Sequence, residues 1–234
     1  MVGAVTRREE VRPWRQFLRR LLPTPTATPF TFGYALVLAV TSLFTEYADP
    51  HLVDRLLQVS STDVEGLAQA PALVMVASAL WIAGGLTSPY ALAFLVVLTA
   101  LERRIGGWRT AGIFLLGHAA TTLVTEVPIA LSVLTGHLPD SSLHRLDYGI
   151  SFGVTAAVGS LAGLLVPWAR LLLAGGTALV LVNELIAFAD PMADWGHLFA
   201  LLIGVASWPL VRRWRRERGG PARDVGQVRR VQKV

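Results

Sequence analysis

Long apolar stretches separated by short polar segments dominate the chain. Six of these stretches are long enough to cross a bilayer, which takes about 20 residues each. We predict spans over residues 30–47, 86–102, 110–134, 149–167, 170–189 and 195–211. A further apolar stretch, 71–84, has only 14 residues, which suits an interfacial or re-entrant segment. The pattern predicts an all-α polytopic membrane protein, a six-helix bundle with a short segment at its outer face.

The positions of the basic residues orient this bundle. With six spans and both termini in the cytoplasm, 19 of the 21 basic residues fall on the inner side, and only Arg55 and Arg145 face outwards. Counting 71–84 as a seventh span would place the two Arg-rich ends on opposite sides, so we reject it. We predict a basic cytoplasmic tail over 1–29, a membrane domain over 30–211 and an Arg-rich, disordered cytoplasmic tail over 212–234.

Composition supports a membrane location and excludes several function classes. Charged residues make up 16% of the chain and the mean hydropathy is +0.52, whereas soluble domains carry about 25% charge. The net charge of +5 lies in tails and loops, so we expect membrane lipid as a partner and no nucleic acid. No cysteine, metal-ligand cluster, phosphate loop or nucleotide fingerprint is present, so we expect no cofactor, metal or nucleotide. The Arg-rich usage suggests a bacterial cell membrane.

Ser151 and His197 are the intramembrane polar residues with the clearest chemical potential. Ser151 lies near the outer end of the fourth predicted span and His197 near the outer end of the sixth. At one depth on neighbouring helices, the imidazole can take the hydroxyl proton and activate the serine as a nucleophile. Ordinary packing is the alternative, because Gly149 and Gly153 are also spaced as a small-residue helix contact.

The other intramembrane polar residues each receive a simpler interpretation. We expect Glu102 to pair with a nearby arginine or cap a loop, and His118 to be a buried, hydrogen-bonded side chain. Glu126 is expected to face water near the outer end of the third span. Of Asn183 and Glu184 in the fifth span, at least one should face the bundle interior or a cavity, as a contact between helices or, less simply, as part of an ion path.

The order of these motifs resembles the rhomboid intramembrane serine proteases and their relatives over roughly residues 30–211. The Gly-x-Ser motif and the small residues that follow it in the fourth rhomboid span are similar to Gly149, Ser151, Ala156 and Gly159. The small residues around the catalytic His of the sixth rhomboid span are similar to Gly196, His197, Ala200 and Gly204. Glu102 matches a glutamate that ends the second span. The resemblance implies Ser151 as nucleophile, His197 as base, and the other small residues as helix-packing positions.

Two departures from the rhomboid pattern affect the expected activity. Phe152 stands where the proteases usually have glycine. Leu86 and Tyr90 stand where they carry a His and an Asn that hold the oxyanion, and losing one such donor costs about 100- to 1000-fold in rate. The Tyr90 hydroxyl and backbone N–H groups at the start of the fourth span are possible substitutes, with Gly149 and Gly153 allowing close substrate approach.

Three functions remain open from the sequence. The first is an intramembrane serine protease that cuts transmembrane segments of other proteins near the outer face, with Ser151 and His197 as its dyad. The second is a catalytically inactive rhomboid-like protein that binds membrane helices. The third and weakest is a transporter that uses Asn183 and Glu184.

Overall fold

The computed structural model describes residues 21–188 and 190–219, in which every regular element is helical. The first half comprises α2 (Pro29–Tyr47), α3 (Pro50–Val59), α4 (Val64–Gln69), α5 (Pro71–Ser78), η1 (Gly85–Thr87), α6 (Pro89–Ala93), η2 (Phe94–Leu98), α7 (Thr99–Ile105) and α8 (Gly107–Leu134). The second half comprises η3 (Asp140–His144), α9 (Ser151–Ala162), α10 (Pro167–Arg170), η4 (Leu171–Gly175), α11 (Gly176–Ala187), α12 (Pro191–Ala206) and α13 (Trp208–Gly219). The predicted helical membrane bundle is therefore confirmed.

Local signals in the sequence fix where many of these helices begin. Helices α2, α3, α5, α6, α10 and α12 each start at a proline, whose fixed φ and missing N–H suit the first helical turn. The side chains of Asp49, Asp63, Ser88 and Asp190 accept hydrogen bonds from the first turns of α3, α4, α6 and α12. These caps set where the four helices begin.

Helices occupy all six predicted span positions, but they differ in length. By length and hydropathy, α2, α8 and the continuous run Pro167–Ala187 are able to cross a bilayer. A fourth span results if α12 and α13, bent by 47°, count together. The second position is filled by α6, the π-helical turn η2 and α7, and the fourth by α9, which has only 12 residues.

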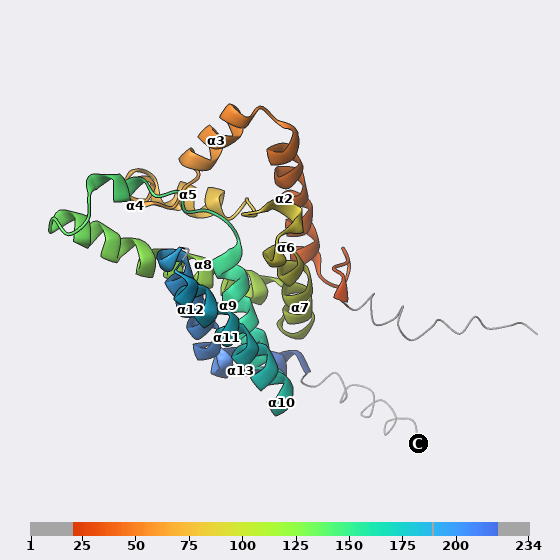
Figure 1. Ribbon diagram of the computed structural model, residues 1–234. Helices are drawn as coiled ribbons and strands as arrows, with labels where there is room; N and C mark the ends of the chain where they lie inside the picture. Colours follow the sequence, from red (N-terminus) through yellow and green to blue (C-terminus); the bar gives the residue numbers. More distant parts are fainter. Residues whose placement is uncertain (1–20, 189, 220–234) are drawn as a thin grey trace, which may run out of the picture.

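Helix α9 forms the centre of the bundle. Its residues from Phe152 to Ala162 are all buried, and it packs mainly against α12 and α8. Because protein rather than lipid surrounds it, a helix about 18 Å long suffices at this position. Figure 1 shows the short helices α3, α4 and α5 at one end of the molecule, with α10 and α13 at the other.

The helix bounds bear on two predicted segments, one of which agrees with the prediction and one of which does not. Helix α5 has eight residues and is too short to span, in agreement with an interfacial segment. The disordered tail expected from residue 212 is wrong for residues 212–219, which belong to α13. The other tail residues, 1–20 and 220–234, lie outside the described part of the chain.

Candidate functional site

A cavity of about 440 Å³ lies at the start of α9. Its wall comes from the turn before α6, the segment 145–150, the first turn of α9 and the first turns of α12. Both Ser151 and His197 line it. The structure therefore brings the two residues singled out in the sequence to one cavity.

The backbone before α9 places Ser151 at this wall. Gly149 has φ of +117°, a conformation that residues with a Cβ rarely adopt, and its N–H donates to the carbonyl of Ser78 at 3.0 Å. The chain then enters α9 at Ser151, which is half-buried. Gly149 thus serves a sharp turn that sets the position of the serine.

His197 is held by two aromatic side chains. Its Nε2 lies 3.1 Å from the hydroxyl oxygen of Tyr90, and the two rings stack with centroids 5.2 Å apart. The ring of Phe152 meets it edge-on, also at 5.2 Å. The imidazole is 7% exposed, so its orientation is set by protein contacts rather than by solvent.

Ser151 and His197 are not hydrogen-bonded to each other in the described part of the chain. The serine hydroxyl has no hydrogen-bond partner among these residues, and the buried Nδ1 of His197 has none either. The Tyr90 hydroxyl, considered as a substitute oxyanion donor, is hydrogen-bonded to the imidazole in this structure. Leu86 does not line the cavity and is 53% exposed.

The small residues of α9 and α12 lie at close helix contacts. A Cβ on Gly153 would lie 2.5 Å from the Phe114 ring, so this glycine serves packing against α8. One on Gly196 would lie 2.6 Å from Phe152. A Cβ on Gly159 would lie 2.5 Å from the Leu201 carbonyl oxygen on α12. The contact between α9 and α12 also includes Gly204. Ala156 on α9 and Ala200 on α12 are fully buried.

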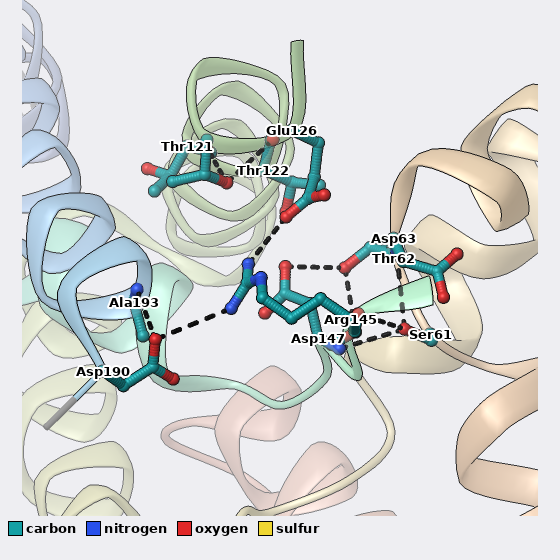
Figure 2. A network of polar contacts seen from close by, with 11 residues as sticks. Ser61, Thr62, Asp63, Thr121, Thr122, Glu126, Arg145, Asp147, Asp190 and Ala193 are labelled. Carbon is teal, nitrogen blue, oxygen red and sulfur yellow. Dashed lines mark hydrogen bonds and ion pairs between the residues drawn. The ribbon is translucent and has the colours of Figure 1, made fainter. Parts of the chain in front are cut away.

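A polar network includes three residues that line the cavity, Arg145, Asp147 and Asp190. Figure 2 shows this network from close by. At its centre Arg145 lies 2.7 Å from a Glu126 oxygen on α8 and 3.8 Å from an Asp190 oxygen at the start of α12. Thr62 donates its backbone N–H to the Asp147 carbonyl at 2.7 Å and its hydroxyl to the Asp147 carboxylate at 3.1 Å. The network ties segment 145–147 to α8, α12 and the loop before α4.

Burial and neighbouring charges shift the pKa values of Arg145 and Asp147 in opposite directions. Burial alone would lower the pKa of Arg145, but the carboxylates of Asp147, Glu126 and Asp190 outweigh it and hold the pKa above its ordinary value. Burial raises the pKa of Asp147, and Arg145 and the Thr62 hydroxyl only partly oppose this. Arg145 is therefore a permanent cation beside a carboxylate that binds protons more readily than usual.

The structure corrects one expectation for the buried acids and sharpens another. Glu126 does not face water: its side chain is 1% exposed and paired with Arg145. Glu102, 2% exposed, accepts hydrogen bonds from the backbone N–H groups of Phe30 and Thr31 and from the Thr31 hydroxyl, at 2.7–3.0 Å. These bonds make it an N-terminal cap for α2, one of the roles that the sequence allowed for it.

Of the two polar residues in the fifth span, Glu184 faces a cavity and Asn183 does not. Glu184 and Tyr90 line a cavity of about 420 Å³ beside α9 and α11. The Asn183 amide donates to the carbonyl of Leu179, one turn earlier in its own helix. This agrees with the expectation that one of the pair faces a cavity.

A buried serine–histidine pair behind the cavity was not expected from the sequence. Ser78 Oγ lies 3.0 Å from Nε2 of His118, which is 2% exposed. The Ser78 carbonyl also accepts from Gly149, so the pair supports the turn that leads to Ser151. The sequence predicted a hydrogen-bonded His118, but the partner is 40 residues away and carries no local signal.

The His197 imidazole and two nearby carboxylates are able to hold a metal ion. One ligand atom from each of Glu184, Asp194 and His197 lies within 4.8 Å of the others. Asp194 Oδ2 is buried without a partner in the described residues, as is Nδ1 of His197. Carboxylate and imidazole are common ligands of zinc and related cations. The donors come from two helices, so spacing along the chain did not reveal this group.

Comparison with protein-family models matches residues 26–217 to a family described as rhomboid-like protein. The matched region includes the whole cavity, the network around Arg145 and most of α13. No curated protein and no solved structure gives a significant match.

Proposed function

The chain belongs to the rhomboid-like protein family, and we propose that it is an intramembrane serine protease acting on transmembrane segments of other proteins. The observation that carries the proposal is the shared cavity, which brings Ser151 and His197 together from two helices. No family motif alone implies activity, because function depends on the site and not on the fold.

In the proposed reaction Ser151 attacks the carbonyl carbon of a peptide bond, and its hydroxyl proton passes to His197. The imidazole then gives this proton to the leaving nitrogen, and a water molecule hydrolyses the acyl-enzyme. If Nε2 carries the ring proton and donates it to the Tyr90 oxygen, Nδ1 is left as the free base. The serine hydroxyl must then reach this nitrogen when substrate binds, since hydrogen bonds of an empty site are often looser.

A cleavage assay on the full chain in liposomes tests the proposal. The probe is a pool of synthetic single-span transmembrane peptides, and mass spectrometry detects the products. Cleavage should be lost in Ser151→Ala and in His197→Gln, while Ser141→Ala, an exposed serine outside the cavity, should retain it. Products that persist in both site variants would exclude the proposed dyad.

The hydrogen bond between Tyr90 and His197 favours a second candidate function. With Nε2 already bound to Tyr90 and no hydrogen bond from Ser151 to His197 among the described residues, the chain would be an inactive rhomboid-like protein that binds membrane helices. The same peptides would then be captured equally by the wild type and by Ser151→Ala, with no products from either. Processing that depends on Ser151 would rule out this function.

A further inference from the structure

Four arginines converge on a cleft at the end of the bundle opposite α3. The cleft measures about 770 Å³ and lies between the end of α9, α10 and α13. The lining arginines are Arg170, Arg212, Arg215 and Arg216. Figure 1 shows α10 and α13 together at this end of the molecule.

Three of these arginines are fixed in place by carbonyl groups at the end of α9 and in the turn that follows it. Arg212 Nε donates to the Gly163 carbonyl at 3.0 Å, and an Arg215 terminal nitrogen donates to Leu164 at 2.8 Å. Arg170 donates to the carbonyls of Ala162 and Leu165 at 3.3 and 3.2 Å. These bonds satisfy groups that a helix end leaves without partners.

The arginine side chains are also oriented by an aromatic ring. The guanidinium carbons of Arg170 and Arg212 lie 5.0 and 5.2 Å from the centre of the Trp208 ring. The indole N–H itself donates to the Gly159 carbonyl at 2.8 Å. Each guanidinium has five N–H donors, so most donors of this ordered cluster remain available to a ligand.

The positive charge of the cleft is not balanced by the described part of the chain. The end of α9 contributes only about half a negative elementary charge, against four cations. No Asp or Glu lines the cleft within residues 21–188 and 190–219. The nearest acid along α13, Glu217, is bound to Arg109 at 2.7 Å and to Arg213 at 3.0 Å. An anion would supply the missing charge.

We propose that this cleft binds the phosphate of an anionic phospholipid headgroup. Guanidinium groups match phosphate oxygens in geometry and charge, and basic pockets between membrane helices are typical headgroup sites. We assign the phosphate to a lipid rather than to free inorganic phosphate because the cleft adjoins apolar surface. The apolar surface lies on the span Pro167–Ala187, which contains Arg170. It includes Trp168, Leu171 and Leu172, which are 69%, 73% and 67% exposed. These side chains offer a path for the acyl chains of the lipid.

Arg216 and Arg213 provide a matched pair of variants on α13. Arg216 lines the cleft and is exposed, with no hydrogen bond or ion pair among the described residues. Arg213 lies outside the cleft, is exposed and pairs with Glu217. Replacing either by Gln removes one positive charge from the same helix. Because Arg216 supports no other residue in this region, its replacement should leave the fold intact.

Native mass spectrometry of the detergent-solubilised full chain, titrated with phosphatidylglycerol, tests the proposal. Wild type should retain one lipid molecule, Arg216→Gln should weaken this binding about tenfold, and Arg213→Gln should change it less than about twofold. Equal retention of phosphatidylcholine, or equal loss in both variants, would overturn a specific anionic site. If a low concentration of inorganic phosphate displaces the lipid, the assignment of the ligand as a lipid is overturned. If the lipid stays bound in the presence of phosphate, that assignment is supported.

Discussion

The guanidinium of Arg145 lies 2.7 Å from the carboxylate of Glu126, a side chain that is only 1% exposed. This pair connects the segment that lines the cavity to α8. The Arg145 side chain is 25% exposed, so water partly screens the pair. The contact is the main ionic support of the wall beside Ser151.

Arg145→Gln should lower the free energy of unfolding by about 2 kcal/mol, below the roughly 3–5 kcal/mol found when fully buried pairs lose one partner. The loss arises because Glu126 remains buried without its cation. Thermal unfolding of the purified chain in detergent measures it. Arg55→Gln, on the exposed surface of α3, should cost less than about 0.5 kcal/mol; equal effects of the two variants would contradict this role of Arg145.

Asp147 should make stability depend on pH. Its pKa is raised in the folded chain, so the folded state binds the proton more tightly, and this contribution is full below the ordinary Asp pKa of about 3.9. It is lost as the pH rises through the folded pKa. The free energies of unfolding of the wild type and Asp147→Asn are measured from about pH 4 towards neutral pH. They should change differently with pH, because only the wild type loses this contribution. Parallel curves would show that Asp147 has no raised pKa.

Glu102 should stabilise the start of α2 from a distance of about 70 residues in sequence. Glu102→Gln keeps one acceptor oxygen but loses the charge that favours a helix N-terminus, so we expect a cost of about 1–2 kcal/mol. The exposed Glu46→Gln on the same helix is the control, with little change expected. Denaturation in detergent compares the two; a neutral Glu102→Gln would argue against the cap.

Tyr90 is a positioning residue in the proposed reaction, because it holds the His197 ring. Tyr90→Phe keeps the ring stack but removes the hydroxyl, and it should lower the rate of Ser151 modification by a fluorophosphonate about tenfold. The melting temperature should stay nearly constant, which separates positioning from stability. Tyr148→Phe, at the same cavity, should leave the rate within about twofold. A rate unchanged in Tyr90→Phe would remove this role.

Hydropathy and charge were sufficient to predict where the helices lie, but not how they end or bend. The sixth span was expected to run straight to residue 211, yet it bends by 47° after Ala206. Pro209, at the start of α13, cannot donate a backbone hydrogen bond and is the local signal for this break. The fourth span was expected over residues 149–167, whereas α9 runs only from Ser151 to Ala162. Hydropathy could not predict this short length, because a helix surrounded by protein need not cross the bilayer by itself.

Contacts between distant residues account for what the sequence could not predict at the site. Glu126 was expected to face water, because nothing near it reveals that Arg145 folds back onto α8. Tyr90 was considered as an oxyanion donor, whereas the fold stacks it on His197, 107 residues away. Ser151 and His197 line one cavity, in line with the equal depth expected for them on their two spans. No hydrogen bond joins them among the described residues, so their pairing as a dyad stays a prediction.

The most direct test of the proposed activity is modification of Ser151 by a fluorophosphonate, a reagent that phosphonylates activated serines with loss of fluoride. The purified full chain in lipid nanodiscs is treated with the reagent, and the modified peptide is identified by mass spectrometry. The proposal predicts an adduct on Ser151 in the wild type and its loss in His197→Gln. No adduct in a folded wild-type chain, or an adduct that forms equally fast in His197→Gln, would contradict it.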